Sequence, residues 1–208
     1  MSKMKIGILA LQGDFREHAE AVKKLGAEAA LVKLPEDLDR VHGLIIPGGE
    51  STTIGMLMER HKLGKAIKKK HKEGMPIYGT CAGAIILAKE IIESRQPKLN
   101  LAEISIKRND YGRQIDSFEA ELDIKGIGKF KGVFIRAPVI KKIHNGAEIL
   151  AEYKKSPVMV KQDSILITTF HPELTDDLRV HKYFMDMAKD YSKVREAQIE
   201  LEKSHNGV

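Results

Sequence analysis

The sequence predicts one three-layer α/β domain in which a mixed, mostly parallel sheet is flanked by helices. In the first half of the chain, short and nearly all-apolar runs alternate with amphipathic segments of helical period. In the second half, strand-like runs with turn signals between them predict antiparallel additions to the sheet. No internal repeat or Pro/Ser-rich linker divides the 208 residues, which favours a single domain.

The first half is expected to alternate strands and helices. Lys5–Leu11 reads as a buried strand that ends at Gln12-Gly13-Asp14. Phe15–Leu25 has apolar residues three and four positions apart, and Gly26 stops this helix. The pattern then repeats, with strands predicted over Glu28–Val32, Gly43–Ile46 and Met75–Gly79 and helices over Ser51–Arg60, Leu63–Glu73 and Ala84–Ile91.

The second half is expected to contribute mainly strands. They are predicted over Glu103–Lys107, Ser117–Ile124, Lys131–Ile135, Glu148–Tyr153, Val158–Gln162 and Ile165–Phe170. An amphipathic helix over Asp176–Tyr191 then closes the fold. Residues 1–191 are therefore assigned to one domain, and residues 192–208 to a polar, loosely held C-terminal tail.

Composition excludes several classes of function. With 42% hydrophobic and 31% charged residues the chain can bury a core, which rules out a disordered protein. A single cysteine excludes an intramolecular disulfide, and no apolar run is long enough to span a membrane, so we expect a cytoplasmic protein without membrane contact. The net charge is +6, but acidic and basic residues are interspersed, so no nucleic-acid binding is expected. No His/Asp/Glu cluster has ligand spacing, which predicts no metal site.

The only cysteine, Cys81, lies in the loop Gly79-Thr80-Cys81-Ala82-Gly83 between a predicted strand and a predicted helix. Gly-x-Cys-x-Gly has the form of a nucleophile elbow, a tight turn from which a reactive side chain projects. The helix N-terminus favours a thiolate, and the N–H of Ala82 could face a developing oxyanion. The alternative is that Cys81 is a small buried hydrophobe between two packing glycines.

A cysteine nucleophile needs a base, and His171 is the candidate because it ends the apolar strand Ile165–Phe170. Glu173, two residues later, could hold the imidazole tautomer, so Cys81, His171 and Glu173 form a candidate triad. Alternatively, His171 is only a strand-ending histidine. The seven other histidines are interpreted as solvated surface groups: His18, His42, His61, His71, His144, His181 and His205.

Three distinctive loops follow the carboxyl ends of predicted parallel strands and should line one crevice: Gln12-Gly13, Pro47-Gly48-Gly49-Glu50-Ser51 and Gly79-Thr80-Cys81-Ala82-Gly83. Adjacent glycines expose backbone N–H groups, so Gly49 could supply a second oxyanion donor beside Ala82. A phosphate-binding loop is the rival reading, weakened by the missing Gly-Lys-Ser/Thr and by the acidic Glu50. A plain turn is the third possibility.

At these residues the sequence resembles the class I (triad) glutamine amidotransferases, a family with a flavodoxin-like core. Within that class it is similar to the glutaminase subunits of pyridoxal 5′-phosphate synthases, and the resemblance runs from about Lys5 to Tyr191. The stretches that carry it are Gly7–Gly13, Pro47–Thr53, Gly79–Gly83, Arg108-Asn109, Tyr111–Gln114, Ser117–Ala120, Phe134–Pro138 and His171–Leu174.

The resemblance implies that Cys81 attacks the side-chain amide of L-glutamine, that His171 protonates the leaving ammonia, and that a γ-glutamyl thioester is then hydrolysed. Ammonia would pass to a separate synthase (lyase) subunit in a large heteromeric complex, whose docking near Gln12 would activate the glutaminase. No cofactor is implied for this chain. The implied oxyanion donors are Gly49 and Ala82, and the implied glutamine contacts are Gly49, Glu50, Ser51, Arg108, Ile135 and Arg136.

Alternatives to this assignment remain. The chain could serve an amidotransferase of another pathway, or act as a stand-alone cysteine hydrolase with a similar elbow. It could also be a non-catalytic scaffold subunit, although a scaffold has no need for an intact candidate triad. Arg108 and Arg136 could be surface residues that pair with Glu119 or Asp116. One departure from the family pattern is Asp14, which gives the Gln12-Gly13 loop more charge than is usual there.

Overall fold

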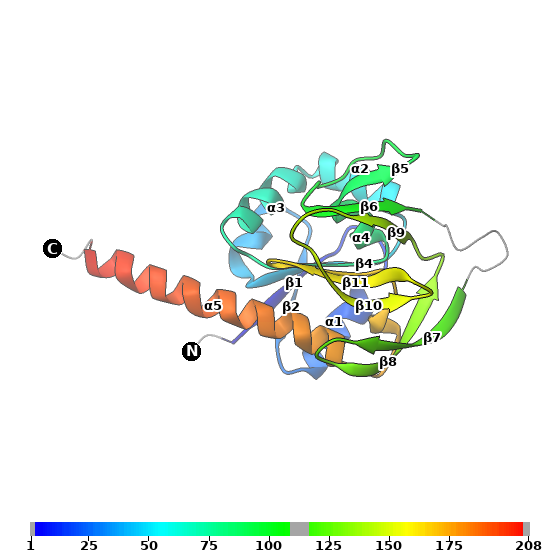
Figure 1. Ribbon diagram of the computed structural model, residues 1–208. Helices are drawn as coiled ribbons and strands as arrows, with labels where there is room; N and C mark the ends of the chain where they lie inside the picture. Colours follow the sequence, from blue (N-terminus) through cyan, green and yellow to red (C-terminus); the bar gives the residue numbers. More distant parts are fainter. Residues whose placement is uncertain (1–2, 109–116, 206–208) are drawn as a thin grey trace.

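A mixed, mostly parallel sheet of seven strands forms the centre of the structure (Figure 1). The computed structural model describes residues 3–108 and 117–205. The strands of this sheet are β1 (Lys5–Leu9), β2 (Glu28–Val32), β3 (Gly43–Ile46), β4 (Ile77–Thr80), β10 (Glu148–Tyr153), β11 (Ser156–Gln162) and β12 (Ile165–Thr168). Their order is β10-β11-β12-β4-β3-β1-β2, with the last five strands parallel. At one edge, β11 and β10 are the predicted antiparallel additions.

Helices cover both faces of this sheet, which confirms the three-layer prediction. On one face α1 (Phe15–Lys24) and α5 (Arg179–His205) bury apolar side chains against residues such as Ile8 and Tyr78. On the other face α2 (Ser51–Arg60), α3 (Leu63–Lys72) and α4 (Ala82–Leu87) pack against residues such as Ile46 and Ile77, together with the short 3-10 helix η1 (Pro35–Arg40). The central strands are mostly apolar because both of their faces are buried.

Two smaller sheets lie beside the seven-stranded one. The first contains β5 (Ala88–Ile92), β6 (Ala102–Lys107) and β9 (Val139–Ile143), and the second is the hairpin of β7 (Ser117–Ile124) and β8 (Gly128–Ile135). The predicted helix over Ala84–Ile91 was wrong in its second half, because α4 ends at Leu87 and the chain continues as β5. The run is apolar at most positions, so periodicity alone could not separate a buried helix from a strand. β9 was not predicted.

The C-terminal helix is longer than expected. The sequence predicted a helix that ends at Tyr191 and a loose tail over residues 192–208, whereas α5 continues to His205. Val180, Phe184 and Ala188 anchor its first half in the core, and its second half extends beyond the sheet (Figure 1). Residues 192–208 are mostly polar, and this composition was interpreted as a loose tail.

Among residues 3–108 and 117–205, no helix is both long enough and apolar enough to cross a lipid bilayer.

Candidate active site

Cys81 occupies the sharp turn between β4 and α4. Its backbone has φ 47° and ψ −101°, a strained conformation of the kind found where a nucleophile projects from a strand-to-helix turn. Gly83 allows this turn to approach β3, because a Cβ atom there would lie 2.0 Å from the Ile46 carbonyl oxygen. The Cys81 N–H donates to the Thr168 carbonyl oxygen at 2.9 Å, and its Sγ lies 3.8 Å from the Ile135 carbonyl oxygen.

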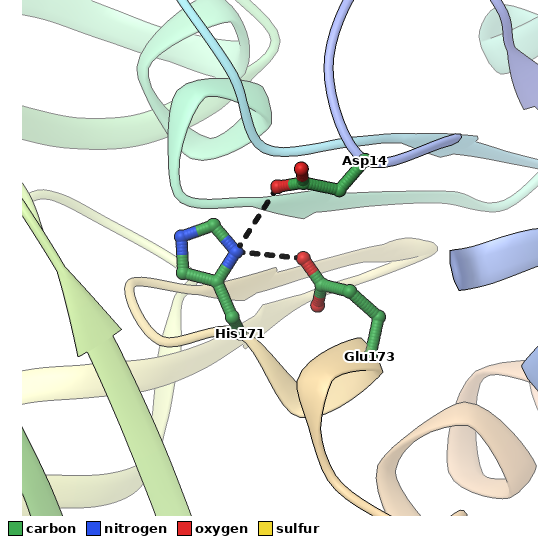
Figure 2. A group of neighbouring side chains, drawn as sticks. All are labelled: Asp14, His171 and Glu173. Carbon is green, nitrogen blue, oxygen red and sulfur yellow. Dashed lines mark hydrogen bonds and ion pairs between the residues drawn. The ribbon is translucent and has the colours of Figure 1, made fainter. Parts of the chain in front are cut away.

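His171 and Glu173 form a buried pair just after β12 (Figure 2). His171 Nδ1 lies 2.7 Å from Glu173 Oε1. Pro172 begins the short 3-10 helix η2 (Pro172–Leu174), which places the Glu173 carboxylate beside the imidazole. The backbone N–H of His171 donates to the Val133 carbonyl oxygen at 2.7 Å, which anchors the backbone of His171 to β8. The pair has the geometry of a base and the carboxylate that orients it.

The protonation of this pair follows from its surroundings. Burial alone would lower the pKa of His171, but Cys81 and Glu173 favour the imidazolium and raise that pKa to about 11. Burial would raise the pKa of Glu173, but contacts with His18 and His171 hold it well below its usual range. His171 Nε2 is buried and has no ordinary hydrogen bond to the described residues. Because the pKa of His171 is raised to about 11, Nε2 carries a proton, which can be given to a reacting group.

A second carboxylate, Asp14, approaches the same imidazole (Figure 2). Its Oδ2 lies 3.5 Å from His171 Nδ1, and burial raises the pKa of Asp14. Asp14, His171 and Glu173 each offer a ligand atom, and these atoms lie within 4.8 Å of one another. Spacing along the sequence did not indicate this group, because folding brings distant residues together. The absence of a metal stays a prediction, and the proton that His171 Nδ1 shares with Glu173 makes it a poor ligand.

One pocket of about 530 Å³ brings most of the expected site residues together. It is lined by eight of them: Gly49, Glu50, Ser51, Cys81, Arg108, Ile135, Arg136 and His171. Four other residues line the pocket but were not predicted as site residues: Asp14, Ile85, Ser117 and Leu174. Asp14 was noticed only as an unusual charge, and the spacing of Ile85 after Cys81, one helical turn, was the signal that could have found it.

The expected oxyanion donors lie at the two backbone turns beside Cys81. Ala82 is the first residue of α4, where backbone N–H groups have no acceptor within the helix. The Gly48 carbonyl oxygen accepts from the Asp14 N–H at 3.1 Å, so the N–H of the same peptide, on Gly49, points the opposite way. Gly49 has φ +145°, and a Cβ atom there would lie 2.5 Å from Gln12 Oε1. That oxygen also accepts from the Glu50 N–H at 2.8 Å, which places Gln12 directly behind the loop.

Arg108 and Glu50 meet at the rim of the pocket. Arg108 donates to Glu50 Oε1 at 3.1 Å and, through its other terminal nitrogen, to Gln96 Oε1 at 2.9 Å. Glu50 also caps α2 by accepting from the N–H groups of Thr52 and Thr53, which lowers the pKa of Glu50 although burial would raise it. The fork of Arg108 is therefore held in place by several acceptors. Gln96 was not identified from the sequence.

Two histidines that were interpreted as surface groups are fully buried, which corrects that prediction. His18 on α1 and His181 on α5 have no exposed surface, and their rings contact each other behind the His171–Glu173 pair. His18 lies three positions after Phe15, and His181 lies three positions before Phe184. This helical spacing could have indicated that both histidines face the core.

Some residues named in the sequence analysis lie outside the described residues: Asn109 and Tyr111–Gln114, which carry part of the family resemblance, and Asp116, a possible partner of the arginines.

A helix-covered parallel sheet with a cysteine elbow beside a His–Glu pair defines the class of protein. A solved crystal structure of a glutamine amidotransferase superimposes on this chain with a TM-score of 0.86 and 50% sequence identity, covering 88% of this chain and 98% of that one. The fold is therefore that of the glutamine amidotransferases.

The chain belongs to the SNO glutamine amidotransferase family, whose model matches residues 8–190. Two relatives, from Thermosipho africanus and Thermotoga petrophila, are each named pyridoxal 5′-phosphate synthase subunit PdxT. They are 49% identical over 187 residues and 52% identical over 188, and each match covers 89% of this chain and 100% of the relative. About a tenth of this chain therefore lies outside each of these matches.

Proposed function

We propose that this chain hydrolyses L-glutamine to L-glutamate and ammonia as the glutaminase subunit of a pyridoxal 5′-phosphate synthase. The observation that carries the proposal is that Cys81, at a strained strand-to-helix turn, lines the same pocket as His171, whose imidazole is held by the buried Glu173. Membership of the SNO family and the two relatives named PdxT support it.

In the first half of the reaction, the Cys81 thiolate attacks the carbon of the glutamine side-chain amide. A carbon–sulfur bond forms and the amide oxygen becomes an oxyanion, which the N–H groups of Gly49 and Ala82 stabilise. The imidazolium of His171 then gives its Nε2 proton to the amide nitrogen as the carbon–nitrogen bond breaks. Ammonia leaves, and a γ-glutamyl thioester remains on Cys81.

In the second half, the neutral His171 takes a proton from a water molecule that attacks the thioester carbon. The carbon–sulfur bond breaks, L-glutamate leaves, and the Cys81 thiolate and the His171 imidazolium are restored. Glu173 keeps its charge throughout, holding Nδ1 so that Nε2 faces the reacting atoms. These steps require no cofactor.

The rim of the pocket suits a zwitterionic amino acid. Arg108 and Arg136 are candidates for the α-carboxylate, because a guanidinium meets a carboxylate with two parallel hydrogen bonds. Glu50 is the candidate for the α-ammonium. The backbone of Gly49 and Ile135 and the side chain of Ser51 complete the proposed glutamine site, and all of these residues line the pocket.

Ammonia made in this pocket passes, in our proposal, to a separate synthase (lyase) subunit within a heteromeric complex. Gln12 is the residue proposed to lie near that partner. Its side chain holds the Glu50 N–H from behind, so a partner that moves Gln12 would act on the proposed oxyanion loop.

The experiment that tests this function is ammonia release from glutamine by the purified chain, with and without the matching synthase subunit. Cys81→Ala is the control, since it removes the nucleophile and leaves a small side chain in a site that is 7% exposed. We expect cysteine-dependent release that the synthase subunit stimulates.

Other outcomes would favour other functions. No release in the presence of a bound partner would favour a scaffold subunit without glutaminase activity. Strong ammonia release that does not depend on the partner would favour a stand-alone hydrolase. Stimulation by a different ammonia-using synthase would favour a role in another pathway.

A further inference from the structure

The buried histidines His18 and His181 form a group behind the proposed triad that the mechanism above does not use. His18 comes from α1 and His181 from α5, and both are fully buried in the core between these helices and β4. Their rings lie 5.2 Å apart between centroids, and each presents an edge to Tyr78. Two imidazoles placed inside a core need hydrogen-bond partners, and those partners indicate their role.

His18 connects this group to Glu173. Its Nε2 lies 3.4 Å from Glu173 Oε1 and 3.1 Å from Thr80 Oγ1, and Thr80 directly precedes Cys81. Its Nδ1 lies 3.0 Å from His181 Nε2. The Glu173 side chain is fully buried, and its Oε2 has no hydrogen-bond partner among residues 3–108 and 117–205. The carboxylate is therefore held through Oε1, the atom that also faces His171.

The positions of the ring protons follow from these contacts. His181 Nδ1 is buried without a partner among the described residues, and burial lowers the pKa of His181 to about 3. A bare ring nitrogen is cheaper to bury alone than an N–H group, so the proton of His181 lies on Nε2 and is donated to His18 Nδ1. His18 therefore carries its own proton on Nε2, the atom that faces Thr80 and Glu173.

We propose that His18 is a positioning residue for the glutaminase reaction. Its Nε2–H faces both Thr80 Oγ1, at 3.1 Å, and Glu173 Oε1, at 3.4 Å, and so favours the position of Oε1 in which it accepts from His171 Nδ1. His181 fixes the tautomer of His18 by donating to Nδ1. The inference rests on the proposed function of Cys81, His171 and Glu173. His18 does not line the pocket that holds Cys81, so in this proposal it acts on the reaction through Glu173.

The test compares His18→Gln with His18→Leu in the complete complex with the synthase subunit. The amide of Gln can place an N–H close to the position of Nε2, whereas Leu fills the space without a donor. For His18→Leu we expect kcat to fall at least about tenfold with KM within about twofold, and for His18→Gln we expect kcat within about threefold of wild type. Thermal unfolding of both variants checks that they fold. Equal losses in two folded variants would overturn the proposal.

A double-mutant cycle separates positioning from packing. If His18 acts through Glu173, adding His18→Leu to Glu173→Gln should lower kcat by less than about twofold more, because the carboxylate that it positions is already gone. The same loss in both backgrounds would mean that His18 contributes only packing, which contradicts the proposal.

A measurement without turnover keeps the inference separate from the proposed function. Ring ¹⁵N shifts of histidine-labelled protein near pH 8, assigned with the His18 and His181 variants, report which ring nitrogens carry protons. We expect protonated Nε2 and bare Nδ1 in both residues. A proton on His18 Nδ1 with a bare Nε2 would overturn the inference even in an active enzyme, whereas an inactive wild-type complex with the expected shifts would count against the proposed function.

Discussion

The Nδ1 atom of His171 lies 2.7 Å from Oε1 of Glu173, inside a part of the protein from which solvent is excluded. A charged carboxylate in such a place orients the imidazole and stabilises its protonated form. Cys81 lines the pocket onto which this imidazole opens. The site therefore places a thiol and an imidazole at one pocket, with an orienting carboxylate against the imidazole.

Replacing Glu173 with Gln should lower kcat for glutamine by about a hundredfold to ten-thousandfold, because the imidazole loses the acceptor that fixes its tautomer. KM should change little, since Glu173 does not line the pocket. Steady-state ammonia release measures both values. Asp14→Asn is the matched control. Asp14 is farther from His171 Nδ1, at 3.5 Å, so its replacement should lower kcat much less. If the two variants had equal activity, Glu173 would not be the orienting group.

Gly49→Ala should lower kcat by about a hundredfold or more through damage to the proposed oxyanion loop. Gly49 has φ +145°, and an added Cβ atom would lie 2.5 Å from Gln12 Oε1 and 2.9 Å from the Gly13 Cα atom. The loop must shift, and the Gly49 N–H shifts with it. Gly146→Ala is a suitable control, since Gly146 also has a positive φ but nothing lies within 4 Å of its added Cβ. Wild-type kcat in Gly49→Ala would contradict the assignment of Gly49.

Arg108→Lys should raise KM for glutamine about tenfold with little change in kcat, because a lysine cannot reproduce the fork of the guanidinium. The arginine now donates to Glu50, Gln96 and Thr52 from its two terminal nitrogens. Lys131→Ala removes an exposed ion pair with Glu119 and should leave KM unchanged. A fall in kcat at constant KM would instead assign Arg108 to the chemical step.

Burial lowers the pKa of His181 to about 3, which should make the free energy of unfolding depend on pH. Below about pH 6.5 the unfolded chain binds a proton at His181 that the folded protein does not, so stability is full above this pH and falls as the pH decreases. His171 does not contribute in this window, since its raised pKa makes stability fall only as the pH rises above about 6.5 toward 11.

Urea unfolding at several pH values between about 4.5 and 6.5 measures this dependence. One proton corresponds to at most about 1.4 kcal/mol per pH unit. The slope in His181→Gln should be smaller than in the wild type by up to this amount, whatever its absolute stability. Identical slopes would show that His181 is not the group responsible.

The sequence predicted the parts of the fold and site that local patterns specify. Apolar runs defined the central strands, and the loops with Gly49, Cys81 and His171 could be assigned to one edge because parallel strands end together. The partners of α1 could not be predicted in this way. Whether His18 faces solvent or Glu173 depends on how α1 rotates against η2 and α5, which lie far along the chain.

The errors have related physical causes. The start of β5 was read as helix because a run that is apolar at most positions fits both periods. The end of α5 was misplaced because residues 192–208 are mostly polar, and such a composition does not by itself distinguish a polar helix from a loose tail. Asp14 was noticed as a charge, but its approach to His171 required the fold.

Covalent capture by a reactive substrate analogue tests whether Cys81 is the nucleophile toward glutamine. A glutamine analogue whose side-chain amide is replaced by an electrophilic ketone is added to the chain in complex with its synthase subunit, and the modified peptide is identified by mass spectrometry. We expect one adduct per chain, on Cys81, with a rate that glutamine lowers by competition and that Glu173→Gln decreases. An unmodified Cys81 in the assembled complex, or a modification rate that glutamine does not affect, would contradict this role of Cys81.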